Sequence, residues 1–189
     1  MTYFTSDLHF GHENIIKHCN RPFSTVEEMD EALIENWNRT VHKCDTVYII
    51  GDVVWDKRKV GYYMERLKGK KILIPGNHDE PWAKREEIKV YFSEIEKYME
   101  RNLCCHPVTL CHYPLLEWRN SREENERKIG FLIHGHIHNR VSEEYLPLYT
   151  NPCALNAGVD LNNYRPVSFE ELVENNNAFK VKALRLLGT

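Results

Sequence analysis

The fold is indicated most strongly by one segment, Lys71-Ile72-Leu73-Ile74-Pro75-Gly76-Asn77-His78-Asp79. Its apolar half is typical of a short buried strand, and Pro75-Gly76 is typical of a sharp turn at the carboxyl end of that strand. Beyond the turn, Asn77 offers a hard oxygen to a metal, His78 can move a proton or hold an anion, and Asp79 can hold an imidazole in one tautomer. Exposed turns also contain these residue types, so the meaning of the segment depends on the other strand ends.

Further apolar runs end in the same kind of polar sequence. They predict strands at 3–6, 45–50, 107–111 and 131–134, and the residues that follow are Asp7-Leu8-His9, Gly51-Asp52, His112 and Gly135-His136-Ile137-His138. Asp7 and His9 are two residues apart, so an extended chain would point both side chains the same way. Strands that alternate with helices predict parallel pairing, and the sites of such sheets lie outside the carboxyl ends of the strands. We therefore expect these polar residues to gather at one edge.

The remaining pattern predicts one domain over residues 1–189 without repeats or a linker. Apolar spacing and a capping box at Thr25–Glu28 predict a helix over about 25–41, and shorter helices are expected at 13–19 and 55–67. Residues 81–101 are interpreted as a helix and a connection, and 117–128 as a solvated loop or helix face, with a lid as the alternative. Strands are expected at 152–157 and 179–187, with a short helix between them capped by Ser168 and Glu171.

Composition narrows the function classes. The chain has 189 residues, 42% hydrophobic and 28% charged, and a net charge of −3, as is usual for a soluble globular protein. The sequence has no basic excess of the kind that would indicate a nucleic-acid partner. Two bound divalent cations, however, would add four positive charges and attract phosphate. We see no secretory signal and no apolar run long enough to span a membrane. The six cysteines lack C-x-x-C or zinc-finger spacing, so we expect reduced thiols and a cytoplasmic protein.

The strand ends together carry five of the ten histidines. Oxygen and imidazole ligands without thiolate suit manganese, iron, nickel, cobalt or zinc. Seven candidate ligands are enough for two ions: Asp7, His9, Asp52, Asn77, His112, His136 and His138. A carboxylate such as Asp52 can bridge two cations, and ions roughly 3.5–4 Å apart suit in-line displacement at phosphorus. They would neutralise the phosphoryl oxygens and lower the pKa of a bridging water, which becomes the nucleophile.

In their order and spacing over positions 7–138, these motifs resemble those of the calcineurin-like metallophosphoesterases. The resemblance implies an α/β protein with a four-layer α/β/β/α sandwich, the metallophosphoesterase fold, and a dimetal site. The segments 5–12 and 156–160 are similar to those of the small bacterial and phage phosphoesterases of this superfamily.

The resemblance also implies a role for each site residue. Asp7, His9, Asp52 and His138 would hold one ion, and Asp52, Asn77, His112 and His136 the other. His78 would protonate the leaving alkoxide or stabilise the transition state, oriented by Asp79. The implied activity is hydrolysis of phosphomono- or phosphodiesters by a metal-bound water. We expect two divalent ions, with manganese as the first choice and iron, zinc, nickel or cobalt as alternatives.

One departure from the family bears on the substrate. In the protein Ser/Thr phosphatases the second motif continues through Asp-Arg-Gly, and its arginine grips phosphate, whereas segment 51–55 here reads Gly-Asp-Val-Val-Trp. Phosphodiesters or small phosphorylated molecules are therefore expected rather than proteins. Spacing does not choose a replacement among Arg119, Arg122, Arg140 and Arg165; we take Arg165, with His12, as the predicted substrate contacts.

Two other functions are compatible with the same motifs. A nuclease-type phosphodiesterase would use the same dimetal chemistry on a nucleotide or nucleic-acid partner, although the bulk charge does not support it. A non-enzymatic scaffold of this fold would lack ligands or the histidine after Asn77, and all of them are present. The sequence leaves the natural substrate and the oligomeric state open.

Overall fold

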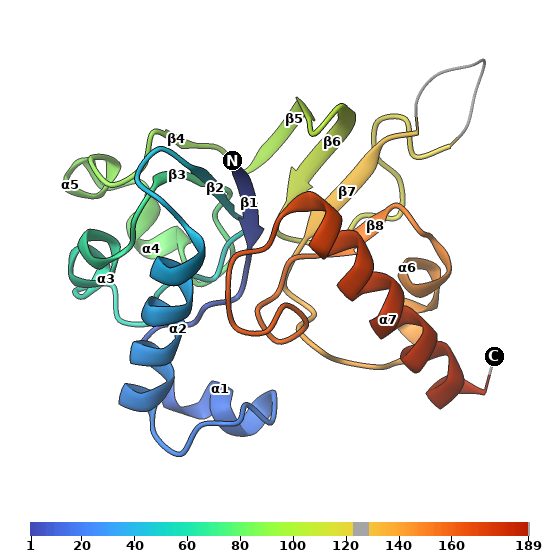
Figure 1. Ribbon diagram of the computed structural model, residues 1–189, viewed down its shortest axis with the longest axis horizontal. Helices are drawn as coiled ribbons and strands as arrows, with labels where there is room; N and C mark the ends of the chain where they lie inside the picture. Colours follow the sequence, from blue (N-terminus) through green and yellow to red (C-terminus); the bar gives the residue numbers. More distant parts are fainter. Residues whose placement is uncertain (123–128, 189) are drawn as a thin grey trace.

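The computed structural model describes residues 1–122 and 129–188. Its first sheet contains four parallel strands in the order β1-β2-β3-β4 (Figure 1). The strands are β1 (Thr2–Thr5), β2 (Thr46–Ile49), β3 (Lys70–Leu73) and β4 (Glu94–Ile95). The first three coincide with predicted strands, and their parallel pairing confirms the expected crossovers.

The second sheet has the order β5-β6-β7-β8. Its strands are β5 (Tyr98–Leu103), β6 (His106–Cys111), β7 (Phe131–His134) and β8 (Ala154–Asn156). β5 and β6 are antiparallel and the other pairs are parallel. The expected helix and connection at 81–101 were only partly right: α4 (Glu80–Ala83) and α5 (Glu86–Lys89) are helical, but β4 and β5 were missed. β5 has a single buried residue, Met99, and polar or charged residues at 100–102, so its sequence lacks the apolar run that identifies the other strands.

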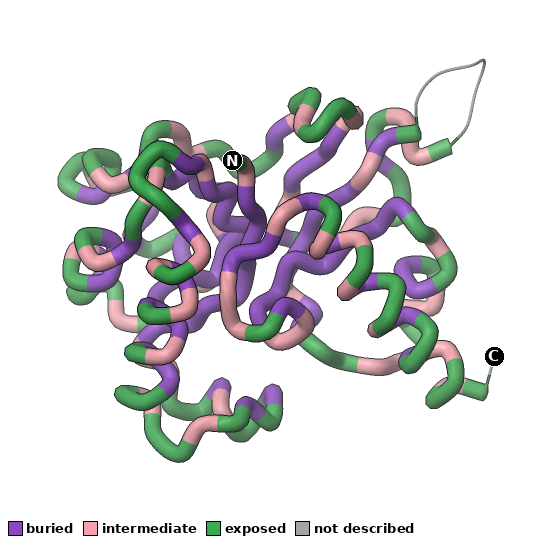
Figure 2. Tube along the Cα trace, in the orientation of Figure 1, coloured by how far each residue is buried: buried purple, intermediate pink, exposed green. Residues whose placement is uncertain are grey.

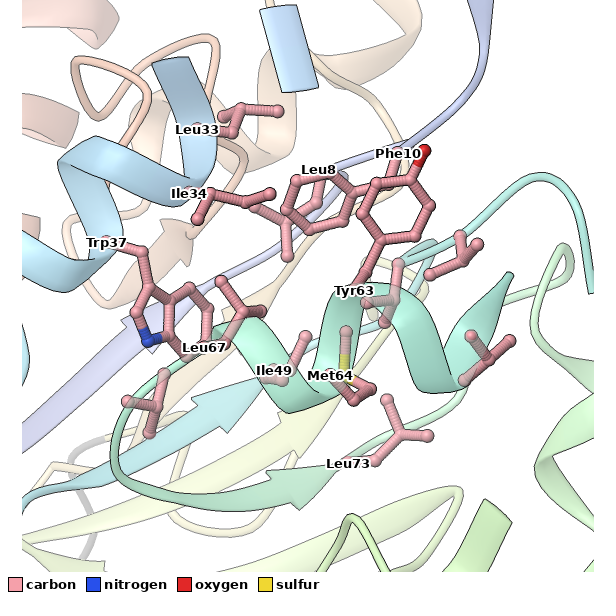
Figure 3. Close-up of a cluster of buried hydrophobic side chains, with 14 of the residues drawn as sticks. Leu8, Phe10, Leu33, Ile34, Trp37, Ile49, Tyr63, Met64, Leu67 and Leu73 are labelled. Carbon is pink, nitrogen blue, oxygen red and sulfur yellow. The ribbon is translucent and has the colours of Figure 1, made fainter. Parts of the chain in front are cut away.

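Two helices cover the outer face of the first sheet, α2 (Val26–Thr40) and α3 (Val60–Arg66), whereas α1 (Glu13–His18) lies below the sheet and joins the same core through Ile15 (Figure 1). The predicted cap of α2 is confirmed, since the Thr25 side chain accepts from the backbone amide of Glu28. α3 is shorter than the predicted helix over 55–67, because residues 55–59 still belong to the loop beyond β2. Figure 3 shows how Trp37 of α2 and Met64 of α3 pack over the sheet beside Ile49.

The prediction of a strand at 179–187 was wrong. These residues form the second half of α7 (Phe169–Leu187), which begins at the predicted capping box of Ser168 and Glu171. Apolar and charged residues alternate over 179–183, but buried positions recur at helical spacing through the whole helix: Phe169, Leu172, Asn176, Lys180 and Ala183. Helix propagation from a strong cap over one buried face therefore outweighs a short local alternation.

The layers confirm the expected α/β/β/α sandwich. One hydrophobic cluster joins the facing sides of both sheets, with Ile50 and Ile74 from the first and Leu110 and Ile133 from the second. Another lies outside the second sheet, under α6 (Leu146–Thr150) and α7, beside the 3-10 turn η1 (Glu143–Tyr145). Figure 2 shows the buried strands at the centre and exposed helix faces outside. One domain over residues 1–189 stays a prediction, which this shared core supports.

Three further expectations concern the loop at 117–128, membrane-spanning segments and the cysteines. The predicted loop or lid at 117–128 falls partly outside the described residues, because the structure describes only 117–122 of it. Among the helices of residues 1–122 and 129–188, none combines the length and apolar character needed to cross a bilayer. No disulfide joins cysteines in the described part of the chain.

Candidate metal centre

Except for Arg165, the predicted site residues meet at the carboxyl ends of β1, β2, β3, β6 and β7. A cavity of ≈ 330 Å³ opens there, and its wall includes seven of them: His9, His12, Asp52, Asn77, His78, His136 and His138. Asp7 and His112 are buried next to these residues. The gathering expected from the parallel topology is therefore observed.

The first candidate ligand group consists of Asp7, His9 and His138, called the Asp7 group below. One donor atom from each residue lies within 4.8 Å of the others, and all three residues are buried. Asp7 Oδ1 is 4.0 Å from His9 Nε2 and 3.8 Å from His138 Nε2. Burial raises the pKa of Asp7, because a charged carboxylate without a cation is costly in this position.

The second ligand group consists of Asp52, His112 and His136, called the Asp52 group below, and it meets the same distance limit. Asp52 Oδ2 is 3.4 Å from His112 Nε2, and it is also 3.7 Å from His9 Nε2 in the first group. Burial opposes the ionisation of Asp52, but its contacts with His112 and His9 hold its pKa below the ordinary value. Asp52 is thus an ionised carboxylate between the two groups.

Four buried side-chain atoms of the described residues have no hydrogen-bond partner, and two of them, His9 Nε2 and His112 Nε2, belong to the site; the others are Thr5 Oγ1 and Trp82 Nε1. Buried polar atoms are almost always paired, so such exceptions call for a missing partner. His112 Nδ1 lies 2.8 Å from the carbonyl of Ile50, which can only accept, so Nδ1 keeps a proton and Nε2 presents a lone pair whenever the imidazole is neutral. A lone pair directed at carboxylates fits a cation between them, and the residues present therefore fit divalent metals.

Side chains that the sequence analysis did not single out hold the Asp7 group in place. His138 Nδ1 is 2.8 Å from Asp160 Oδ2, and Arg21 pairs with Asp160 at 2.8 Å while donating to the backbone carbonyl of Asp7 at 2.7 Å. Asp160 ends the segment 156–160, which resembled a family pattern but suggested no role. A third candidate group, formed with Cys19, shares both His138 and Asp160. Because Arg21 already occupies that carboxylate, we assign Asp160 to the support of His138.

Backbone groups hold the Asp52 group. The backbone N–H of His78 donates to Asp52 Oδ1 at 3.0 Å. Asp79 is fully buried and accepts from the amides of Asp52, Val53 and Gly76 at 2.7–2.9 Å. These bonds tie the loop after β2 to the loop after β3. Asp79 therefore positions the two loops through backbone amides, whereas the resemblance implied that it orients the His78 imidazole. Burial raises the pKa of the Asp79 carboxyl to about 7.

The four imidazoles of the two groups differ in the direction of their pKa shifts. Burial lowers the pKa of His112 and of His138, but the carboxylates bonded to them outweigh that effect and raise the values to about 9 and about 10. Burial lowers the pKa of His9 and of His136. Each group therefore contains one imidazole that favours the protonated form and one that favours the neutral form.

The local backbone differs from the expected extended strand. β1 ends at Thr5, so Asp7 and His9 are not two residues of one strand face. Five predicted ligands have φ between 52° and 71°: Asp7, His9, Asp52, His136 and His138. The left-handed region costs a non-glycine residue about 1–3 kcal/mol, and such strain concentrates at functional sites. Sharp turns, rather than strand alternation, bring these side chains together.

The predicted substrate contacts separate in the structure. His12 lies on the cavity wall, and its Nδ1 is 3.5 Å from His9 Nδ1. Arg165 instead pairs with Glu171 at the start of α7 at 2.6 Å. Among the arginines weighed as alternatives, Arg140 lines the cavity.

Comparisons with known proteins agree with this geometry. The model of the calcineurin-like phosphoesterase family matches residues 2–141. The chain is 37% identical to an uncharacterized protein of Methanocaldococcus jannaschii, MJ1445, covering 91% of this chain and 89% of that protein. It is 32% identical to the Gene 66 protein of Mycobacterium phage L5, covering 72% and 77%. A solved protein of unknown function from Aquifex aeolicus, AQ665, matches with a TM-score of 0.70 and 29% identity, covering 92% and 98%. The chain therefore belongs to the calcineurin-like phosphoesterase family, a family of metal-dependent phosphoester hydrolases.

Proposed function

We propose that the protein is a dimetal hydrolase of phosphodiesters or small phosphomonoesters. The observation that carries the proposal is the position of Asp52 Oδ2, which is 3.7 Å from His9 Nε2 and 3.4 Å from His112 Nε2. One carboxylate oxygen thus faces an imidazole of each ligand group. A carboxylate in that position can bridge two cations, and paired cations suit displacement at phosphorus.

In this proposal the Asp7 group and Asp52 hold one ion, and the Asp52 group and Asn77 hold the other. The support for Asn77 is its place on the wall of the same cavity. Imidazole and oxygen donors favour manganese, with iron, zinc, nickel and cobalt as alternatives. Bound ions would neutralise charge on the phosphoryl oxygens and lower the pKa of a water.

His78 is the proposed proton donor. Its side chain is 37% exposed at the cavity, and its Nε2 lies 3.9 Å from Asp52 Oδ2. The backbone N–H of His78 donates to Asp52 Oδ1, which keeps the backbone of His78 next to the carboxylate proposed to bridge the ions. A histidine at the edge of the site can donate a proton to the leaving alkoxide of a bound ester. Because its ring is also exposed to solvent, it can then take up a new proton from water. Asp79 contributes by holding the loop that carries His78.

The direct test is a screen of purified protein for hydrolysis of an aryl phosphate and a bis-aryl phosphate. Each substrate is tested with manganese, iron, zinc, nickel and cobalt. We expect turnover with at least one metal and none after chelation. A metal-loaded protein that cleaves neither ester would overturn the proposal.

His78→Ala tests the mechanism separately from metal binding. We expect kcat to fall about 10²–10⁴-fold, the usual cost of removing a proton donor, with metal content unchanged. His42→Ala is the matched control, because His42 is exposed in the loop before β2 and should leave turnover unchanged. If His78→Ala loses metal instead, His78 is a ligand and its proposed role is wrong.

A further inference from the structure

Trp55 lies beside the candidate metal centre because the loops after β1 and β2 stay paired beyond the sheet. Phe10 and Val54 form an isolated parallel bridge, and the backbone N–H of Trp55 donates to the carbonyl of Phe10 at 2.9 Å. Phe10 and Val54 are both buried, so this pairing is anchored in the core. The next side chain outward, that of Trp55, is thereby held at the rim of the site.

The indole of Trp55 is oriented but not covered. Its centroid is 3.8 Å from that of His12, with an angle of 6° between the rings, and 4.9 Å from that of His78. Nevertheless Trp55 is 49% exposed, whereas the other tryptophans are buried: Trp37, Trp82 and Trp118. Exposure of a large aromatic ring forgoes the apolar burial that usually keeps tryptophan inside. A fixed, exposed ring next to His78 points to a ligand that covers it.

A second exposed ring borders the other ligand group. Tyr113 follows β6 and is 46% exposed. Its ring centroid lies 4.8 Å from that of His136 and 5.2 Å from that of His112. Exposed aromatic rings therefore adjoin both the proposed proton donor and the Asp52 group.

We propose that Trp55, backed by His12, is a stacking platform for the nucleobase of a nucleotide phosphodiester whose phosphate lies at the metal centre. This inference rests on the proposed function, which supplies the phosphate site. A base laid on Trp55 would extend the near-parallel stack that His12 already forms. Stacking on an aromatic side chain tolerates any base, since every base has a π face. Tyr113 offers a ring to the group esterified on the other side of the phosphorus.

The same features limit the form of the nucleotide. A base can lie on an indole only when it is not stacked and paired within a duplex, so the platform selects single nucleotide esters and single strands. The chain carries a net charge of −3 and no basic excess to hold a long polyanion. Within the cavity, Arg140 and His18 are the groups available to a neighbouring phosphate.

Binding can be read from Trp55 itself, since it is the exposed one of the four tryptophans. Zinc-loaded protein is mixed with AMP or with ribose 5-phosphate, and the stopped-flow amplitude of tryptophan emission is recorded before any turnover. We expect AMP to quench the emission and ribose 5-phosphate to leave it unchanged. Trp55→Ala should weaken AMP binding, followed by calorimetry, about 5- to 150-fold. Trp55→Phe should restore most of that affinity, because it keeps a ring.

Tyr62→Ala is the matched control, since Tyr62 is 56% exposed on α3 next to Arg66 and outside the cavity. It should leave AMP affinity unchanged. Equal affinity of the wild type for AMP and ribose 5-phosphate would overturn the platform. An equal loss of affinity in Trp55→Ala and Tyr62→Ala would do so as well.

Hydrolysis gives an independent reading. Adenosine 5′-(methyl phosphate) and ribose 5-(methyl phosphate) differ only in the base, and chromatography of the products gives kcat/KM for each. We expect a preference of at least about 5-fold for the adenosine ester, lost in Trp55→Ala and kept in Tyr62→Ala. If neither ester is cleaved but AMP still quenches Trp55, the proposed function fails and the platform stands. If both are cleaved equally, the function stands and the platform fails.

Competition with bound AMP shows whether the ligand is a short nucleotide ester or a single-stranded nucleic acid. A single-stranded dodecamer that displaces AMP no better than a dinucleoside monophosphate identifies a short ester as the ligand. A dodecamer that displaces AMP more strongly identifies a single-stranded nucleic acid. Displacement by a blunt duplex more strongly than by its separate strands would overturn the proposal, because the bases of a duplex cannot reach the indole.

Discussion

The Asp7 group and the Asp52 group have the same composition, one buried carboxylate and two imidazoles, but different supports. An ion pair between two side chains, Arg21 and Asp160, holds the Asp7 group. Backbone atoms hold the Asp52 group, among them the carbonyl of Ile50 and the amides tied together by Asp79. The Asp7 group therefore depends on an ion pair in addition to the backbone amide of His136, whereas the support of the Asp52 group runs through backbone atoms that the Asp79 carboxylate gathers.

This difference separates two ways of damaging the site. A support made of side chains can be removed by a single substitution at a residue that touches no ion. A support made of backbone survives most substitutions, but it requires residues that let the chain pass close to the ligands. The two halves should therefore respond to different variants, and that expectation can be broken by measurement.

The largest effect is expected from Asp160→Ala. It leaves the guanidinium of Arg21 buried without its partner, which costs about 3–5 kcal/mol of unfolding free energy for a broken buried pair. It also removes the acceptor behind His138, and loss of such a support lowers metal affinity about 10–100-fold. Urea unfolding gives the first quantity, and calorimetric metal titration the second. We expect one weakened class of sites and one unchanged class.

The control for Asp160→Ala is Glu31→Ala. Glu31 forms a comparable pair with Arg66, but on the surface, where solvent screens it. Its loss should cost at most about 1 kcal/mol and leave metal binding unchanged. Equal weakening of both classes of metal site in Asp160→Ala would contradict the separate support of the Asp7 group. Asp160→Asn, which keeps an acceptor, serves if the alanine variant does not fold.

The next largest effects are expected from alanine substitutions at two glycines, one beside each ligand group. A Cβ on Gly135 would contact the hydroxyl of Ser6 and lie 2.5 Å from Asp7 Oδ2, whereas a Cβ on Gly76 would contact Asp52 Oδ1 and lie 2.8 Å from the Asp52 amide nitrogen. Overpacking of this kind costs about 1–3 kcal/mol. Next to Gly135 the Ser6 hydroxyl can rotate away, and of that side chain only the Ser6 Cβ, at 2.9 Å, stays close, whereas the backbone amide next to Gly76 cannot move by rotation, so Gly76→Ala should lower the unfolding free energy more than Gly135→Ala. Thermal unfolding of the two variants side by side decides the order.

The strand ends and their ligands could be predicted from the sequence because each signal is local. An apolar run followed by a turn and a polar residue, as in 71–79, needs no knowledge of the rest of the chain. Parallel topology then brings these ends to one edge. The same locality leads to the wrong prediction at 179–187, where a short alternation lies within a helix that is capped by Ser168. It also missed β5, whose strand state depends on pairing with β6 rather than on its own sequence.

The supports could not be predicted, because they join positions far apart in the chain. Arg21 and Asp160 are separated by 139 residues and meet only once the two sheets are in place. Asp79 stands next to His78, which suggested a local pair, yet its carboxylate reaches the loop after β2. The exposure of Trp55 is likewise a tertiary property. Sequence therefore indicated which residues could ligate and left open what positions them.

The pH dependence of metal binding should also distinguish the Asp7 group from the Asp52 group, with a smaller effect than the substitutions above. A cation needs a neutral nitrogen, so it must displace the proton of His138, with a pKa of about 10, or that of His112, with a pKa of about 9. These pKa values are raised, so the proton is held at pH 7 and metal affinity should increase as pH rises. We expect up to about tenfold per pH unit for each ion, levelling near pH 9 for the Asp52 group and near pH 10 for the Asp7 group. Calorimetry in two buffers of different ionisation enthalpy counts the released protons; no release at pH 7 would contradict the assignment.

The smallest effect is expected from Ser6→Ala, which tests whether the halves are as separate as their supports suggest. The Ser6 hydroxyl lies 2.7 Å from Asp7 Oδ2 and 2.5 Å from the carbonyl of Ile50, the same carbonyl that faces His112 Nδ1. Loss of one such hydrogen bond costs about 1 kcal/mol, or about fivefold in affinity. If the hydroxyl donates to Asp7, metal titration should show weakening of the Asp7 group alone. If it donates to Ile50, its removal leaves that carbonyl wholly to His112, and the affinity of the Asp52 group should change instead.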